Sequence, residues 1–501
     1  MKRKKDSIYP TRASQRCNKA KGKVDDDETQ NHQLCPYFAN IPSHLVAQIL
    51  LQLPIKSLVI CKCVCKMWKT LISEPHFAKL HFEKTPVNLL IRKKGYIRVS
   101  RTLYLLECEP EKFEIGSDNR VKLQPIFKLP LCDARLLREK MMYKLNRPVR
   151  AVRLALEKNK NSDGGSQMLN INIRPYDDKF GVVKSCNGLL CLCSPEGNPL
   201  VICNPATGEF IRLPKAINTP NRLRLLEPVG FGFGFQPKTN EYKVIQMWKK
   251  VVRNAYPQVL KRMILEIYTL GTPSWRNVEV DPQVSNSRLK YPTCLNGVIH
   301  WIRFEGQNRS MSILCFCLES ERLQSFPSPP DVFGNHHRIS RNERISMGGS
   351  RGLLYICDTS SFHDGTMWVM NEYGIGESWT KVYNIDTSIS SLGRPDKHGL
   401  CWPLKHFEDG ASMLSYHSCN CLIYYEPENY GFKVFQIHGS PFVEIIPHIP
   451  SIISLKDIVK GDNIEVLNIY SMCANVKLRE ENEVLSLSQF GGEEFGDHPV
   501  S

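Results

Sequence analysis

The chain has 501 residues, of which 42% are hydrophobic and 23% charged, and its formal net charge is +16 at pH 7. This apolar content is enough for a packed core, which excludes a wholly disordered chain, and the length favours two to four domains of ~100–200 residues each. No window approaches the ~18 consecutive apolar residues of a membrane-spanning helix. Residues 1–5 (MKRKK) lack the apolar segment of a secretory signal. We therefore expect no membrane association, and a location in the nucleus, the cytoplasm or both.

The cysteine content points to a reducing compartment. The chain holds 19 cysteines, an odd number, and no Cys-x-x-Cys occurs. Several cysteines stand two positions apart, a spacing of ~6.5 Å on a strand, which is too wide for chelation by such a pair alone. We therefore expect buried free thiols rather than disulfides, and neither a metal nor a cofactor.

Residues 1–34 are predicted to form a disordered tail. The first 23 residues hold nine Lys or Arg against one acidic residue, and four acidic residues follow at 25–28. Segments with such charge and few large apolar residues do not bury enough surface to fold. A nuclear import signal, a nucleic-acid-binding tail and a solvated tail without function all fit this pattern.

Residues 35–85 carry a helical pattern. Ser43 is a candidate N-cap, and apolar residues at spacings of three and four follow it. Pro54 ends this helix and begins a second one, and a third helix is expected to end at Glu74-Pro75. Three short helices in ~40 residues enclose too little core to be stable alone. The pattern therefore predicts a module that packs against a neighbouring domain or a partner.

This module resembles the F-box in its plant form. The resemblance is carried by Ile41-Pro42, Leu53-Pro-Ile-Lys-Ser-Leu58, Cys63-Val-Cys-Lys-Met-Trp68 and Leu71-Ile72. His44 and Ala47-Gln48 stand where the family usually has an acidic pair in the first helix. The resemblance implies docking on a Skp adaptor, and the residues that it places at that interface are Ile41, Pro42, Leu45, Ile49, Leu53, Pro54, Val64, Cys65, Trp68 and Leu71.

Residues 87–479 change to short apolar runs rich in aromatic and β-branched residues, without a helical period. Sheet-like units recur every ~40–65 residues, near the lengths of kelch and WD40 blades, and three of them open with a Gly after Asn187, Asn296 and Arg351. Because radial stacking buries both faces of each sheet, we predict an all-β, kelch-like β-propeller of about six blades. A β-sandwich is the less favoured alternative. Residues 480–501, rich in Glu and Gly, are expected to fray.

The β region resembles the plant F-box-associated domain. Together the two resemblances imply the substrate-recognition subunit of a Skp–cullin–F-box (SCF) ubiquitin ligase. The F-box would dock on the Skp adaptor, and through it on the cullin and RING subunits, while the propeller holds a protein target. Such a chain is a non-catalytic adaptor, and its target is not readable from the sequence. The matching segments are Ser185-Cys-Asn-Gly-Leu-Leu-Cys191, Asn204-Pro-Ala-Thr-Gly208, Gly232-Phe-Gly-Phe-Gln-Pro-Lys-Thr-Asn-Glu-Tyr-Lys-Val244, Leu295-Asn-Gly-Val-Ile-His-Trp301 and Glu377-Ser-Trp-Thr-Lys381.

The sequence patterns that resemble catalytic or metal-binding motifs are incomplete. The run from Gly348 to Gly352 matches Gly-x-Ser-x-Gly, but a strand is expected after it, whereas a nucleophile elbow needs a helix. His336-His337 and His363-Asp364 lack further ligands at metal-binding spacing.

Two other functions stay open. A nucleic-acid-binding protein fits the basic charge, although no zinc finger or RNA-recognition signature occurs, and a Skp-bound scaffold outside any ligase fits the same fold. Because binding sites concentrate on loops, a target site is predicted at three polar insertions, Trp248 to Leu260, Ser328 to Ser340 and Thr387 to Lys397.

Overall fold

The structure of the chain is a computed structural model. The chain falls into two compact units, residues 1–46 and 47–501. Of the first unit the structure describes 41–46, which include the start of the first helix. The described residues of the second unit are 47–94, 99–108, 120–128, 182–193, 199–214, 216, 226–250, 262–278, 287–305, 311–330, 345–350, 352–359, 364–386, 401–407, 412–417, 419–426, 431–440, 442–459, 464–468 and 485–489.

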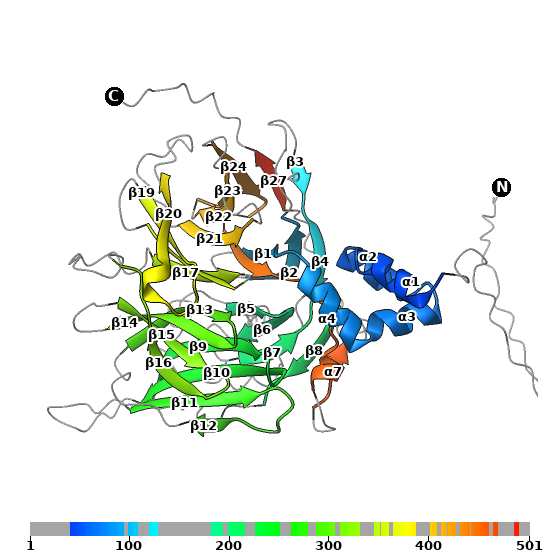
Figure 1. The fold of residues 1–501 in the computed structure, drawn as a ribbon, viewed down its shortest axis with the longest axis horizontal. Helices are drawn as coiled ribbons and strands as arrows, with labels where there is room; N and C mark the ends of the chain where they lie inside the picture. The colour runs from blue at the N-terminus through cyan, green and yellow to red at the C-terminus, as the bar shows by residue number, and fades with distance from the viewer. Residues whose placement is uncertain are drawn as a thin grey trace, which may run out of the picture. The chain divides into compact units, whose positions relative to one another are not determined.

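The helical region confirms the predicted type of structure but contains one more helix than expected (Figure 1). Pro75 does not end the helical region; it is the first residue of a further helix, where a proline loses no hydrogen bond. Leu58, Ile72 and Phe77 are buried side chains of three successive helices. The helices are α1 (Ser43–Leu50), α2 (Ile55–Cys61), α3 (Lys66–Ser73) and α4 (Pro75–Lys84).

The described strands form six antiparallel sheets, which we number as blades 1 to 6. In each of blades 3 to 5, four consecutive strands pair in chain order. Blade 3 has β9 (Leu226–Gln236), β10 (Glu241–Lys250), β11 (Arg262–Thr269) and β12 (Arg276–Val278). Blade 4 has β13 (Ser287–Leu295), β14 (Val298–Glu305), β15 (Met311–Cys317) and β16 (Arg322–Phe326). Blade 5 has β17 (Ile345–Ser350), β18 (Leu353–Asp358), β19 (Asp364–Met370) and β20 (Trp379–Asp386).

The other three blades combine strands from distant parts of the chain. Blade 1 has the order β25 (Val443–His448), β1 (Asn88–Lys94), β2 (Val99–Leu106) and β4 (Gln124–Lys128). Blade 2 has β5 (Val182–Cys186), β6 (Leu189–Cys193), β7 (Pro199–Cys203) and β8 (Glu209–Arg212), with β26 (Leu467–Asn468) added at its edge. Blade 6 has β21 (Cys401–His406), β22 (Met413–His417), β23 (Cys421–Glu426) and β24 (Gly431–His438), extended by β27 (Ser486–Gln489) and β3 (Arg120–Lys122).

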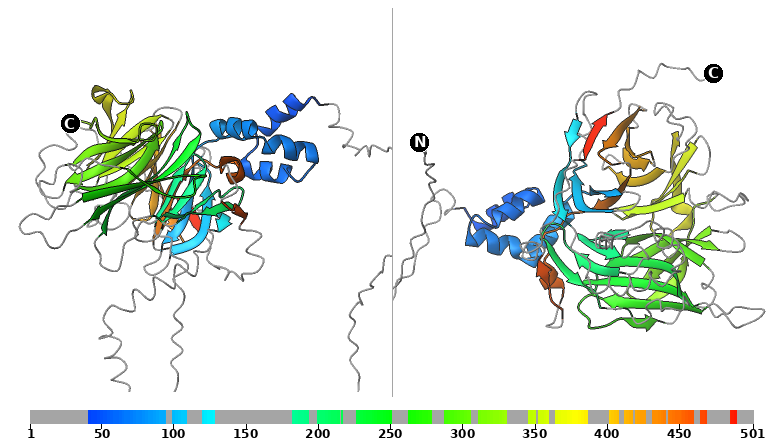
Figure 2. Two further views of the ribbon diagram at one scale, coloured as in Figure 1. Left: turned by 90° about the horizontal axis from the view of Figure 1, so that it is seen from below. Right: turned by 180° about the vertical axis from the view of Figure 1, so that it is seen from behind.

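One strand of each blade contacts the corresponding strands of its two neighbours, and these contacts close a ring. The order around the ring is β25, β5, β9, β13, β17, β21 and back to β25. The sheets therefore form a six-bladed β-propeller, as Figures 1 and 2 show, and the predicted fold class is confirmed.

The ring is closed by the C-terminal part of the chain. β25 pairs with β1 from Asn88 opposite His448 to Lys93 opposite Val443, so the first blade takes its innermost strand from the other end of the sequence. β26 pairs with β8, and β27 pairs with β24. β27 falls in the segment for which the sequence predicted fraying. Its Leu487 and the preceding Leu485 are buried, which explains why this short piece is ordered against blade 6.

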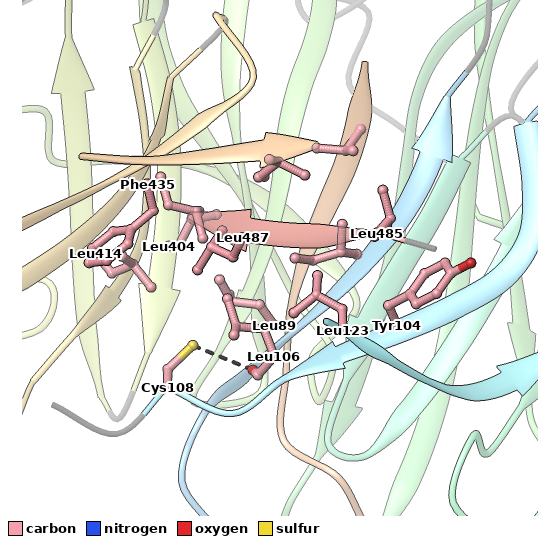
Figure 3. Packing of buried hydrophobic residues seen from close by; sticks show 14 of the residues in the cluster. Leu89, Tyr104, Leu106, Cys108, Leu123, Leu404, Leu414, Phe435, Leu485 and Leu487 are labelled. Atoms are coloured by element: carbon pink, nitrogen blue, oxygen red, sulfur yellow. Dashed lines mark hydrogen bonds between the residues drawn. The ribbon is translucent and has the colours of Figure 1, made fainter. Parts of the chain in front are cut away.

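Each pair of neighbouring blades encloses its own hydrophobic cluster. Figure 3 shows the cluster between blades 6 and 1, where Leu89 of β1 lies with Phe435 of β24 and Leu487 of β27. Cys108 belongs to this cluster, and its thiol donates to the Leu106 carbonyl at 3.5 Å (Figure 3). It is one of several buried free cysteines, which the sequence predicted as small apolar core residues.

The glycines of β9 allow blades 3 and 4 to approach closely. A Cβ atom at Gly232 would lie 2.8 Å from Cζ2 of Trp301, and one at Gly230 would lie 2.8 Å from Cβ of Leu289. Trp301 is fully buried, and its indole N–H donates to the Phe231 carbonyl at 2.8 Å. The glycine-rich run of β9 is thus a packing surface for a tryptophan.

The predicted target-binding loops are mostly not described by the structure. The insertion placed at Trp248 to Leu260 begins too early, since Trp248 lies within β10 and is buried. Residues 249–250 and 328–330 are also described. The rest of the three insertions falls in 251–261, 331–344 and 387–400, which lie outside the described residues.

Candidate adaptor-docking site

The F-box helices expose large apolar side chains. Four of these belong to the second unit, and we call them the exposed apolar set: Ile49, Val59, Ile60 and Val64. Their exposed fractions are 57%, 40%, 68% and 61% respectively. In the first unit, Leu45 stands four residues before Ile49 on α1 and is 42% exposed. Large apolar side chains that stay exposed in so short a segment are candidates for burial against a partner.

The helical period explains why these side chains are not in the core. In α2, Leu58 is fully buried, and the next two residues, Val59 and Ile60, are turned away from it by ~100° and ~200°. A helix lying on the surface buries one stripe only. Since α2 carries apolar residues on its other side as well, Val59 and Ile60 are exposed.

His81 of α4 bonds to the turn that connects α1 and α2. Its Nε2 donates to the Leu53 carbonyl at 3.0 Å, and its Nδ1 lies 3.1 Å from the Thr85 hydroxyl. Burial lowers the pKa of His81, and the hydrogen bond to Leu53 raises it in part. A neutral imidazole with both nitrogens engaged fixes the position of the chain just before Pro54, where α2 begins.

The residues that the resemblance assigned to the adaptor interface divide into two groups by exposure. Pro42, Leu45, Ile49, Pro54 and Val64 are exposed, whereas Ile41, Leu53, Cys65, Trp68 and Leu71 are half-buried. Their role as adaptor contacts stays a prediction.

Cys65 has a structural role. It is the N-cap of α3, and its sulfur accepts a hydrogen bond from the Trp68 amide at 3.4 Å.

The residues predicted for the adaptor interface do not include two exposed apolar side chains of α2, Val59 and Ile60, of which Ile60 is the most exposed large apolar side chain among the described residues. A signal was present in the unbroken run Leu58-Val-Ile-Cys61, which is apolar on every side of one helical turn. A helix with such a run is either buried all round or covered by a partner.

Within the described residues, no group of three or more His, Cys, Asp or Glu side chains could hold a metal ion. Gly348 and Gly349 lie in β17, and after the turn at Gly352 the chain enters β18. The Gly-x-Ser-x-Gly run therefore lacks the strand-to-helix turn that a nucleophile elbow requires.

Both the helical part and the β part of the chain match known protein families. Residues 38–80 match the F-box domain, and residues 149–458 match the F-box associated beta propeller domain. The chain is a plant F-box protein of the F-box-associated β-propeller family. The matched ranges contain α1 to α3 and most of the propeller.

Several Arabidopsis thaliana proteins are similar to this F-box protein. It is 28% identical to F-box protein At3g07870 over 292 residues, which cover 52% of this chain and 67% of that protein. It is 27% identical to putative F-box protein At1g53550, with 73% of this chain and 75% of the other covered. For F-box/kelch-repeat protein At3g23880 the identity is 23%, covering 74% and 85%.

The combination of an F-box with a propeller gives this F-box protein the general character of an adaptor-type substrate receptor. Among the helices that the structure describes, none is both long and apolar enough to cross a lipid bilayer.

Proposed function

We propose that this F-box protein is the substrate-recognition subunit of an SCF ubiquitin ligase. Its F-box helices dock on a Skp-type adaptor, which joins them to the cullin and RING subunits, and its propeller holds a target protein. The observation that carries the proposal is the exposed apolar set on the F-box helices, Ile49, Val59, Ile60 and Val64. Burying these side chains against an adaptor would remove a large apolar surface from water.

The proposed mechanism is proximity rather than chemistry by this chain. A target held on the propeller has its lysines kept near the ubiquitin thioester carried by the conjugating enzyme. Holding two reactants together converts an encounter in solution into an effectively unimolecular step. The receptor therefore contributes binding, while the bond to ubiquitin is formed elsewhere in the assembly.

We also propose that the protein acts in a reducing compartment, the cytoplasm or the nucleus, where its 19 cysteines would stay free thiols.

The proposal is tested by reconstitution. The full-length protein, mixed with a recombinant Skp-type adaptor, should elute with it as one complex on gel filtration. Purification from cells with blocked proteasomes should then recover the adaptor, the cullin and ubiquitylated clients together. Recovery of the adaptor without a cullin would identify a scaffold outside any ligase. Recovery of nuclease-sensitive nucleic acid with no adaptor would favour the nucleic-acid-binding alternative.

A further inference from the structure

Within the sequence stretch that carries the exposed apolar set, all the charges are of one sign. Between Ile41 and Ser73 the chain has four lysines, Lys56, Lys62, Lys66 and Lys69, and neither Asp nor Glu. The first acidic residue after this stretch is Glu74. Surface helices of soluble proteins usually mix both signs, which limits their electric field. This stretch therefore has a net positive field that its own sequence does not cancel.

The structure shows where this charge is accessible. On α3 the exposed positions are Lys66, Lys69, Thr70 and Ser73, which follow the helical spacing of three and four. None of the ion pairs among the described residues involves Lys66 or Lys69. The outer side of α3 therefore presents two ammonium groups to solvent directly after the exposed Val64.

Lys62 differs from these two lysines. It is half-buried at the end of α2, and burial lowers the pKa of its ammonium. The carboxylates of Glu209 and Asp457 act in the opposite direction and raise the pKa, whereas Lys69 lowers it further by repulsion. Acidic groups of the chain thus act on Lys62, and the positive charge of Lys69 repels that of Lys62.

We propose that the adaptor surface which receives the F-box helices is an apolar groove bordered by carboxylates, and that Lys66 and Lys69 steer the two proteins together. The inference rests on the proposed function, because it specifies the chemistry of the partner at the same site. Buried apolar side chains supply most of the affinity of such a contact, while charges at its rim act on the association rate. Complementary charges at the rim raise that rate by factors of about 10 or more at low ionic strength.

The apolar side chains and the lysines should therefore affect different rates, dissociation and association respectively. Loss of an apolar side chain should accelerate dissociation, because the contact it makes exists only in the complex. Loss of a steering charge should slow association and leave dissociation nearly unchanged. Steering should also weaken as salt is added, because screening shortens the reach of each charge to about 10 Å at 0.1 M ionic strength.

The test measures association and dissociation rates of the full-length protein with a recombinant Skp-type adaptor, at about 20 mM and about 500 mM salt. The reversal variant carries Lys66→Glu and Lys69→Glu. The matched control carries Arg322→Glu and Lys381→Glu, two exposed residues on the outer strands β16 and β20, and so has the same net charge.

We expect the wild type to associate about tenfold more slowly at high salt than at low salt. The reversal variant places two carboxylates against the acidic rim, so it should associate more than about tenfold more slowly than the wild type at low salt, and faster as salt is added, because screening weakens the repulsion. The control should behave as the wild type, and all three proteins should dissociate at similar rates.

An association rate that is independent of salt, or reversal and control variants that associate equally fast, would overturn the inference while leaving adaptor docking intact. A wild type that does not bind the adaptor at all would instead overturn the proposed function. The two failures are therefore distinguishable in one set of measurements.

Discussion

Ile60 offers the sharpest test of the docking surface. It is the most exposed of the large apolar side chains in the described part of the chain, at 68%, and lies near the end of α2. Replacing it by Asp removes that apolar surface and puts a carboxylate in its place. Because the side chain is largely in solvent in the free protein, we expect the thermal stability of the Ile60→Asp variant to match that of the wild type.

The expected loss of binding follows from the exposed fraction. Complete burial of an isoleucine side chain contributes about 1.5–3 kcal/mol, and 68% of that is about 1–2 kcal/mol. An Ile60→Ala variant should therefore bind the adaptor about 5–30-fold more weakly. The Asp variant should lose at least about 100-fold, since a carboxylate in an apolar contact also gives up its hydration without a partner.

The assay is isothermal titration or surface binding of the full-length variants to a Skp-type adaptor. A matched control is Ile375→Asp, because Ile375 is also exposed, at 45%, but lies just before the 3-10 turn η4 (Gly376–Ser378) of blade 5. The control should bind as the wild type does. An Ile60→Asp variant that binds within about twofold of the wild type would refute the assignment of α2 to the docking surface.

Three predictions concern the propeller. The Gly232→Val substitution should lower the free energy of unfolding by about 1–3 kcal/mol, measured by thermal unfolding, because its Cβ would lie 2.8 Å from Trp301; an unchanged midpoint would contradict this packing. The buried Asn204 amide donates to the carbonyls of Ser451 and Ile453, in the segment that follows β25. The Asn204→Ala substitution should therefore lower the free energy of unfolding in urea by about 3 kcal/mol and speed proteolysis of that segment. A variant as resistant to protease as the wild type would contradict this role of Asn204. Burial lowers the pKa of His448 to about 3 and of His300 to about 4. The unfolded chain therefore binds more protons below about pH 6.5, and each histidine should remove about 2 kcal/mol of stability at about pH 5; a urea-unfolding series that stays flat from neutral to that pH would contradict the burial.

The sequence predicted the parts of the fold that depend on the pattern of neighbouring residues. The F-box motif from Ile41 to Leu80 was recognisable in the sequence, and the recurrence of sheet units predicted a propeller. The recurrence suggested about six blades without fixing their number, which the structure gives as six. The starts of the strands were less accurate. The Asn-Gly pairs expected at the openings of strands are turns, with φ values of 45° and 83° at Asn187 and Gly188, and of 51° and 74° at Asn296 and Gly297. Such paired positive φ values are typical of tight hairpin turns.

The sequence did not predict the features that depend on contacts between distant parts of the chain. β27 is only four residues long, and its order comes from pairing with β24 and from Leu485 and Leu487, which lie in the core between blades 6 and 1. The exposure of Ile60 likewise depends on which side of α2 packs inward, and apolar spacing alone did not decide that. Pro75 was interpreted as a helix end because a proline fits both the end of one helix and the start of the next.

The pairing of β25 with β1 has a consequence for the order in which the protein is made. The ion pair between Arg92 and Glu444 joins residues 352 positions apart, so the first blade stays incomplete until almost the whole polypeptide has left the ribosome. The F-box helices, by contrast, involve only early residues and emerge first. A nascent or truncated product that stops before Val443 would therefore carry the adaptor-docking helices without a closed ring. Under the proposed function, such a fragment would occupy adaptor molecules without the closed propeller that is proposed to hold the client, so productive assembly would need the C-terminal strands.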